Sequence, residues 1–217
     1  MKRLFDILLA LAGISASMPL WAIISFIVLV DGRGPVFYSQ DRVGRSGRIF
    51  KGIKFRSMIH EAEKESGPIQ AHSDDARITA IGKVLRSTAM DELPQLINIL
   101  KGDMSFVGPR ALRPEEKEAG SVVVRSIFEV PGFERRSRVR PGLTGIAQVF
   151  APRDISREKK FKYDIWYIEN GGFLLDMYLM VLSVMITLTG KWEAGGERFV
   201  SLGRALRKRV EGEIRGV

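Results

Sequence analysis

The chain begins with one long, uninterrupted run of uncharged and mostly apolar positions. No charged side chain occurs from Ile7 to Val30, whereas Lys2 and Arg3 stand just before the run. A run of 18 or more such residues predicts a helix that enters a membrane. Pro19 lies near the middle of the run, where it removes a helix hydrogen bond and clashes with the preceding turn. We therefore expect residues 1–30 to form a helix, a break and a second helix that dips into one leaflet and returns.

Two other interpretations of this run stay open. Basic residues flank both of its ends, whereas a spanning helix that follows the positive-inside rule has them at one end. A re-entrant segment would place both flanks on the cytoplasmic face, but proline also occurs in straight spanning helices. A cleaved signal peptide is the third interpretation, since residues 15–17 are small, but the apolar run continues from Leu20 to Val30. Ser15 and Ser17 are placed to bond the backbone groups that the proline frees.

Beyond this run the pattern predicts an α+β, mainly helical domain over residues 31–217, with a small β element. Residues 34–40 follow a turn and resemble a strand, and residues 48–55 alternate between apolar and polar side chains. A polar loop is expected over residues 61–75. Helical spacing predicts helices over residues 78–85, 93–100, 114–128 and 158–169. A second apolar run, residues 177–190, is too short to span a bilayer and suits a core or interfacial helix.

Composition narrows the chemistry that this domain can use. The chain of 217 residues has no cysteine, which removes disulfides, thiol nucleophiles and iron–sulfur clusters. Its two histidines, His60 and His72, are too few for a supported histidine relay or metal site. The net charge of +9 points to an anionic partner, which is nucleic acid, an acidic membrane surface or a phosphorylated substrate. The basic tail is compatible with either a solvated helix face or anionic lipid, and comprises Arg204, Arg207, Lys208, Arg209 and Arg215.

One acidic pair stands out among basic residues and turns. Asp91 and Glu92 precede Pro94, which is tolerated in the first turn of a helix, so by themselves they resemble ordinary helix-start acids. Two turn-rich segments, residues 102–110 and 140–145, each present an arginine, as a diphosphate site requires. Two adjacent carboxylates also suit a divalent ion, which would offset their repulsion with a diphosphate. The basic residues that we predict around this pair are Lys54, Arg56, Arg86, Arg110 and Arg140.

The most specific motifs are Asp-Glu-Leu-Pro-Gln-Leu at residues 91–96 and Lys-Gly-Asp-Met-Ser-Phe-Val-Gly-Pro-Arg at residues 101–110. With these motifs the chain resembles the monotopic phosphoglycosyl transferases, bacterial sugar transferases that start glycan assembly on polyprenol phosphate. It resembles their small form, which is little more than the catalytic core. Met18 and Ala111 depart from the family pattern, which has serine and proline there. The other matching blocks are residues 2–6, 40–44, 54–58, 75–79, 82–86, 98–100, 140–148 and 160–167.

The resemblance implies a monotopic membrane fold and a two-step reaction. Asp91 would attack the sugar-bearing phosphate of a UDP-sugar and release UMP, and polyprenol phosphate would then take the sugar phosphate from Asp91. A carboxylate nucleophile needs charge neutralisation rather than an activating base. Mg2+ on Asp91 and Glu92 would supply it, and Glu92 would assist the pair. The basic residues named above would contact phosphate and nucleotide.

The resemblance also implies a place in the cell and a set of partners. The site would lie on the cytoplasmic face of the bacterial inner membrane, against anionic lipid, with interfacial amphipathic helices beside the re-entrant anchor. The pathway would be the assembly of exopolysaccharide, O-antigen or glycoprotein glycans. A homodimer is left open, and no nucleic acid partner is expected. The alternative from a different class is a membrane-tethered basic module that binds nucleic acid or anionic lipid, although the chain has no recognisable nucleic-acid-binding motif.

Overall fold

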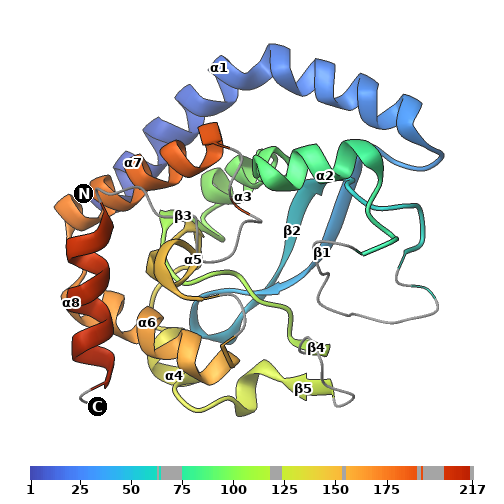
Figure 1. Ribbon diagram of the computed structural model, residues 1–217. Helices are drawn as coiled ribbons and strands as arrows, with labels where there is room; N and C mark the ends of the chain where they lie inside the picture. The colour runs from blue at the N-terminus through green and yellow to red at the C-terminus, as the bar shows by residue number, and fades with distance from the viewer. Residues whose placement is uncertain are drawn as a thin grey trace.

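One long helix arches over a body of shorter helices and small strand pairs (Figure 1). The structure is a computed structural model of the chain, and it describes residues 1–62, 64, 75–117, 124–152, 155–189, 192 and 203–215. Most of the predicted loop over residues 61–75 lies outside the described residues. The observed architecture is mainly helical with a few short strands, which confirms the predicted mixture of helices with a small β element.

The apolar N-terminal run forms helix α1, Lys2–Asp31, with Pro19 inside it. The predicted break does not divide the helix in two, because α1 continues through the proline, although it arches along its length (Figure 1). The Ser17 hydroxyl, two residues before the proline, donates to the Gly13 carbonyl over 2.6 Å and accepts from the Trp21 indole N–H over 3.0 Å. Proline bends a helix without having to end it. A re-entrant path in a membrane therefore stays a prediction, without the break that motivated it.

Helix α1 is long and apolar enough to cross a membrane, a property it shares with signal sequences and core helices. Its inner side contacts the body through buried Ala10, Ile24 and Val28. Helix α7, Phe173–Thr189, also has many exposed apolar side chains, and the rings of Phe5 and Phe173 meet edge to face at 5.4 Å. The exposed large apolar residues on these two helices are Leu4, Leu8, Leu11, Met18, Ile23, Phe26, Ile27, Leu29, Val30, Phe173, Leu174, Val181, Val184 and Leu188.

The two predicted strands form an antiparallel hairpin, β1 at Phe37–Val43 and β2 at Ile49–Phe55. A 3-10 turn, η1 at Arg45–Gly47, joins them. The pairing of Tyr38 with Lys54 puts the lysine near the end of β2, and the neighbouring Phe55 is buried under α1. The hairpin therefore fixes the position of Lys54.

Three short helical segments follow the hairpin, of which the helical spacing predicts the first and the third. They are α2 at Ala80–Ser87, the 3-10 turn η2 at Met90–Glu92, and α3 at Gln95–Lys101. The Thr79 hydroxyl caps α2 by accepting from the Gly82 amide over 2.9 Å. Gly82 also lies so close to the hairpin end that a Cβ there would approach the Ser57 carbonyl oxygen to 1.9 Å. Only glycine lets α2 pack against this segment.

Strand β3 at Ser105–Val107 pairs in parallel with β6 at Gly142–Thr144. This pairing joins the two turn-rich, arginine-bearing segments. The backbones approach so closely that a Cβ on Gly142 would lie 2.1 Å from the Gly108 nitrogen, and one on Gly145 would lie 2.1 Å from the Gly108 oxygen. The glycines in these motifs therefore allow the backbones of two segments that are far apart in the sequence to come into contact.

The C-terminal half is helical and holds the largest apolar core. It contains α4 at Phe133–Arg136, α5 at Ile146–Phe150, α6 at Arg157–Asn170, α7, and α8 at Arg204–Arg215. Phe150, Leu179 and Val210 are fully buried where α5, α7 and α8 meet. The predicted helix over residues 158–169 is confirmed as α6, and the predicted apolar helix is confirmed as α7. In the basic tail, Arg207 and Arg209 pair with Glu211 and Glu213 one turn further along α8.

The helix predicted over residues 114–128 is wrong. Strands β4 at Glu115–Lys117 and β5 at Val124–Ser126 pair antiparallel there, followed by the 3-10 turn η3 at Ile127–Glu129. The sequence contains the physical reason, since Gly120 and Ser121 precede three consecutive valines. Glycine and serine favour a turn, and β-branched side chains favour an extended strand over a helix.

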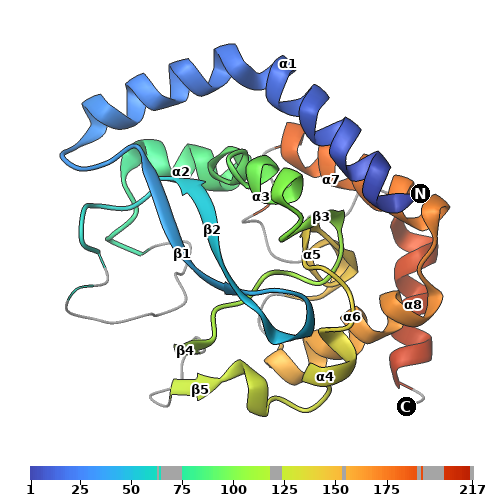
Figure 2. The ribbon, with the colours of Figure 1, turned by 180° about the vertical axis from the view of Figure 1, so that it is seen from behind.

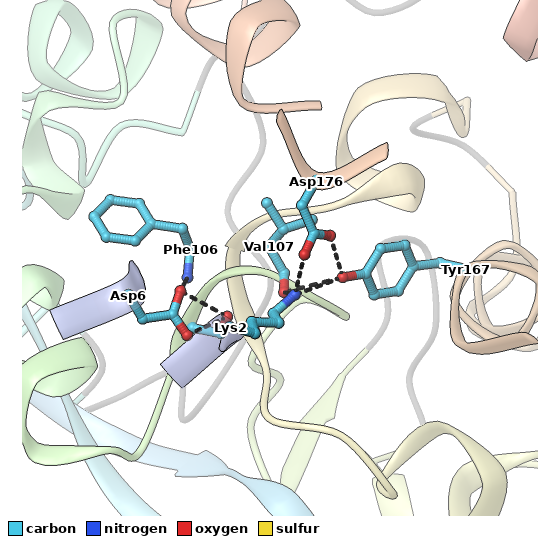
Figure 3. A network of polar contacts seen from close by, with 7 residues as sticks. Lys2, Asp6, Phe106, Val107, Tyr167 and Asp176 are labelled. Carbon is cyan, nitrogen blue, oxygen red and sulfur yellow. Dashed lines mark hydrogen bonds and ion pairs between the residues drawn. The ribbon is translucent and has the colours of Figure 1, made fainter. Parts of the chain in front are cut away.

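A buried polar network attaches the start of α1 to the body (Figure 3). The Lys2 ammonium donates to Asp176 on α7 over 2.6 Å, to the Tyr167 hydroxyl over 2.8 Å and to the Val107 carbonyl over 3.0 Å. Asp6, only 2% exposed, accepts from the Ser105 hydroxyl and the Phe106 amide. Figure 2 shows the same end of α1 beside α7 from the opposite side. The network thus defines how α1 docks.

We expect Lys2→Met to destabilise the protein by about 1–3 kcal/mol, because it leaves the buried Asp176 carboxylate without its cation. Because the Lys2 side chain is partly exposed, the expected loss of stability is smaller than for a fully buried ion pair. Thermal unfolding in detergent measures the effect. Lys51→Met is the matched control, since the Lys51–Asp41 pair is exposed on both sides. Equal unfolding temperatures for the two variants would contradict a stabilising role for the network.

Candidate active site

A large cavity of about 1500 Å3 opens in the body beneath α1. One part of its wall is apolar and is made mainly by α1, α3 and α7, including Leu9, Leu96, Met177 and Met180. The other part is polar and receives side chains from β1, β2, η2, α4 and α6. The cavity therefore offers one surface suited to a hydrocarbon chain and another suited to a polar, charged group.

The Asp91–Glu92 pair lies in the polar wall of this cavity. Both residues belong to η2, which Ala89 precedes in a left-handed conformation with φ 55°. That turn separates η2 from the end of α2, and Pro94 is the N-cap residue of α3 shortly afterwards. Asp91 is 6% exposed and the Glu92 side chain is 12% exposed. Two adjacent carboxylates at this depth require cations nearby.

Lys54 and Arg110 provide cations for the pair. The Lys54 ammonium lies 2.5 Å from Glu92 Oε1 and 3.6 Å from Asp91 Oδ2. The Arg110 guanidinium donates to the same Glu92 oxygen over 3.1 Å. Lys54 comes from the hairpin and Arg110 from the segment after β3, so residues distant in sequence converge here. The predictions that placed Lys54 and Arg110 beside the acidic pair agree with this geometry.

The two carboxylates have opposite electrostatic environments. Burial raises the pKa of Asp91 above its usual value, and its cations only partly oppose this effect. Burial alone would also raise the pKa of Glu92, but Lys54 and Arg110 outweigh it and lower that pKa to about 2. Glu92 is therefore a compensated anion, whereas Asp91 is incompletely compensated and lines the open cavity. Such an aspartate is the better candidate for attack on a substrate or for binding a further cation.

The remaining predicted cations occupy different places. Arg86 lines the cavity and its charge lowers the pKa of Asp91, so it belongs to the site. Arg56 also touches the cavity, but its guanidinium donates to the carbonyls of Val28, Gly32 and Arg33 and thereby closes the end of α1. Arg140 is not part of the described cavity wall, and its Nε donates to the Gly102 carbonyl over 2.9 Å. Both arginines hold backbone in this structure.

Sequence reasoning missed one cation of the site. Arg42 lines the cavity, lowers the pKa of Glu92 and donates to the Ala111 carbonyl over 2.8 Å. It lies inside the motif at residues 40–44, so the sequence did contain a signal that Arg42 belongs to the site. Strand alternation could not reveal that it lies near Glu92 of η2 and bonds Ala111 after β3, because both are far from it in the sequence.

The described residues contain no group of three or more His, Cys, Asp or Glu side chains that could hold a metal by themselves. The acidic pair nevertheless fits Mg2+, which commonly takes one or two carboxylates together with substrate phosphates. Asp91 is the more available ligand of the two, because Lys54 and Arg110 already engage Glu92. The acidic pair is buried in a large cavity and has several cationic side chains beside it. Such an arrangement is typical of an enzyme site for an anionic substrate.

Comparison with known proteins identifies the enzyme class. The bacterial sugar transferase family matches residues 1–190. An uncharacterized sugar transferase of Bacillus subtilis, EpsL, is 36% identical over 197 residues, covering 88% of this chain and 89% of that protein. The chain therefore belongs to the bacterial sugar transferase family, and it is a phosphoglycosyl transferase, the class that its motifs predict.

Two further relatives have names that state their substrates. A UDP-N-acetylgalactosamine-undecaprenyl-phosphate N-acetylgalactosaminephosphotransferase of Aeromonas hydrophila is 38% identical, over 87% of this chain and 44% of that protein. A UDP-glucose:undecaprenyl-phosphate glucose-1-phosphate transferase of Klebsiella pneumoniae is 38% identical, over 84% of this chain and 39% of that protein. The chain thus spans less than half the length of these two relatives.

Proposed function

We propose that this protein transfers a sugar 1-phosphate from a UDP-sugar to polyprenol phosphate and releases UMP. The observation that carries the proposal is Asp91, an incompletely compensated carboxylate beside cations in a cavity that is polar on one side and apolar on the other. The names of the relatives from Aeromonas hydrophila and Klebsiella pneumoniae support the same pair of substrates.

The proposed reaction has two displacements at one phosphorus atom. First, an Asp91 carboxylate oxygen bonds to the sugar-bearing phosphorus while the bond from that phosphorus to the bridging oxygen breaks, and UMP leaves with that oxygen. Next, a phosphate oxygen of polyprenol phosphate bonds to the same phosphorus, the bond to Asp91 breaks, and the free carboxylate returns. Neither step needs a general base, because both nucleophiles are anions.

The surrounding cations suit this charge movement. Lys54 contacts both carboxylates and so stays next to the phosphorus as charge develops. Arg86 and Arg110 add positive charge on the cavity wall, where anionic substrate and leaving phosphate would lie. Fixed cations in a water-poor site are worth more than in bulk solvent. Glu92 keeps Lys54 and Arg110 in place, because its lowered pKa leaves it ionised at neutral pH.

We further propose that Mg2+ binds at Asp91 and Glu92. When bound, the ion would neutralise diphosphate charge that the two carboxylates otherwise repel. We expect a chelator such as EDTA to reduce UMP release to background and added Mg2+ to restore it. Unchanged UMP release in excess EDTA would exclude an essential metal. A binding measurement with Mg2+ alone, compared between wild type and Glu92→Gln, tests the ligand assignment apart from turnover.

The exposed apolar faces of α1 and α7 support a place at the membrane. They border the apolar part of the cavity, so a polyprenyl chain in the bilayer could extend to the active site without crossing water. The polar part would then face the aqueous side, which for a UDP-sugar donor is the cytoplasm. We propose the cytoplasmic face of the inner membrane, with α1 as the anchor and α7 beside it.

One experiment tests both the reaction and its covalent step. Purified protein in detergent with Mg2+ is mixed with a panel of UDP-sugars, without and with polyprenol phosphate. We expect at most one UMP per protein without the acceptor, with the sugar phosphate bound to protein, and continuous release with it. Continuous release that strictly requires both substrates and leaves no protein-bound sugar would favour direct transfer. No UMP release from any UDP-sugar would overturn the proposal.

A further inference from the structure

A tryptophan just beyond the end of α7 connects the apolar wall of the cavity to the segment that carries the acidic pair. Trp192 lines the cavity and packs against the apolar core of the C-terminal half. None of the motifs that identify the family contains it. The other two tryptophans of the chain, Trp21 and Trp166, are not part of the described cavity wall. Trp192 is therefore a large aromatic residue of the cavity for which the proposed chemistry gives no role.

Two hydrogen bonds fix the position of Trp192. Its backbone N–H donates to the Ser87 carbonyl over 3.3 Å, and its indole N–H donates to the Thr187 hydroxyl over 2.8 Å. Ser87 is the last residue of α2, and residues 88–90, which lead from it to Asp91, line the cavity. Thr187 lies in the last turn of α7 and lines the cavity as well. Trp192 therefore joins the end of α7 to the end of α2, directly before the turn that carries Asp91.

The surface that Trp192 adds to the cavity is apolar. The indole N–H is the only polar group of the side chain, and Thr187 already accepts from it, so the rest of the ring is hydrocarbon. Helix α7 continues this surface along the cavity wall with Met180, Val181 and Val184, which we call the α7 strip. Val181 and Val184 are 52% and 56% exposed, so the strip begins at the outside of the molecule. An apolar path therefore runs from the exposed side of α7 to Trp192.

The place of this path indicates which substrate uses it. A UDP-sugar consists of polar groups, to which an apolar wall offers no hydrogen bonds. Polyprenol phosphate instead has a hydrocarbon chain attached directly to the phosphate that would attack at Asp91. When that phosphate reaches Asp91, the first isoprene units must lie next to η2, where the apolar path ends. Burying hydrocarbon against the indole removes apolar area from water and so favours binding.

We propose that Trp192 binds the acceptor substrate, with its indole ring in contact with the isoprene units nearest the phosphate of polyprenol phosphate. This inference rests on the proposed function, because it assigns a contact for the proposed acceptor. The hydrocarbon chain then follows the α7 strip outward. Trp192 thereby sets where the acceptor phosphate lies relative to Asp91, because Trp192 is bonded to the end of α2 just before the catalytic turn.

Two variants of Trp192 separate its ring surface from its hydrogen bond. We expect Trp192→Ala to raise the KM for polyprenol phosphate at least about tenfold, equivalent to about 1.4 kcal/mol, and to leave the KM for the UDP-sugar within about twofold. Trp192→Phe keeps an aromatic surface but loses the N–H, so its KM for polyprenol phosphate is expected to stay within about threefold of wild type. Phe128→Ala is the control, since it removes an exposed ring outside the described cavity wall.

Three kinetic results would overturn the proposal. A KM for polyprenol phosphate in Trp192→Ala equal to that of Phe128→Ala would show that the ring does not touch the acceptor. A rise in the KM for the UDP-sugar alone would show that the ring stacks on the donor instead. A fall in kcat with both KM values unchanged would show that Trp192 only holds α7 against α2.

Tryptophan fluorescence tests the same contact without turnover and without the alanine variant. Protein in detergent is titrated with polyprenol phosphate, and separately with UMP. We expect polyprenol phosphate to change the emission of the wild type and of Trp21→Phe but not that of Trp192→Phe, and UMP to change none of them.

Two fluorescence results would overturn the proposal. They are an unchanged wild-type emission with polyprenol phosphate, and the same change in Trp192→Phe as in the wild type. Absence of UMP release from any UDP-sugar would instead reject the proposed function, because the fluorescence response needs no reaction.

Discussion

Asp91→Asn is expected to abolish the protein-bound sugar phosphate and to lower UMP release at least about a thousandfold, as removal of a covalent nucleophile does. The amide has nearly the shape of the carboxylate but lacks the negative charge that attacks phosphorus. Lys54 would stay paired with Glu92, so the surrounding site should remain assembled. The measurements are UMP release and retention of labelled sugar phosphate on the protein. Asp41→Asn is the control, because Asp41 lies in an exposed ion pair on β1.

Glu92→Gln separates the roles within the acidic pair. Glu92 is expected to anchor Lys54 and Arg110 rather than to attack, so this variant should react slowly but still form the protein-bound intermediate on Asp91. If Asp91→Asn formed the intermediate and Glu92→Gln did not, the assignment of the nucleophile would be reversed. Full UMP release by Asp91→Asn would rule out attack by this residue.

Gly142→Ala is expected to destabilise the fold by about 3 kcal/mol or more, because the added Cβ meets backbone that cannot move aside. The Cβ would lie 2.1 Å from the Gly108 nitrogen and 2.4 Å from the Thr144 oxygen. For a domain of this size the unfolding temperature should fall by roughly 6–12 °C. Activity should fall as well, because the Gly142 amide donates to the Pro109 carbonyl next to Arg110.

Gly172→Ala is the matched control for this substitution. Nothing lies within 4 Å of the Cβ that it would add, and the residue stands between α6 and α7. Its unfolding temperature is expected to stay within about 2 °C of wild type, in line with surface substitutions. If Gly142→Ala matched Gly172→Ala in thermal unfolding, the β3–β6 contact would not be a tight one.

Several elements could be predicted from the sequence because their signals are local. The charge-free run of α1, the alternation in β2 and the helical spacing of α2, α3 and α6 each follow from burial of one face or of a whole segment. The Asp91–Glu92 pair was recognisable because it stands before Pro94, and the motifs around it identify the family. Where local signals competed, prediction failed, as at residues 114–128.

At Pro19 the chemistry of proline predicts a break in the helix, but contacts made elsewhere along α1 keep the helix continuous. Proline removes one hydrogen bond, but the turns on either side of it remain helical. Packing of Ala10 on one side of the proline, and of Ile24 and Val28 on the other, holds both halves of the arched helix α1 against the body (Figure 1). Contacts on either side of the proline therefore decide the path of the helix, and a sequence pattern does not contain them.

The sequence by itself determined the enzyme family, the acidic pair and the apolar N-terminal helix, since each depends on residues close together along the chain. Only the tertiary structure decided which cations serve the pair. Lys54, Arg42 and Arg110 reach it from separate segments, while Arg56 and Arg140 hold backbone carbonyls instead. An arginine has the same charge in either role, and the difference comes from which groups folding brings within hydrogen-bond distance.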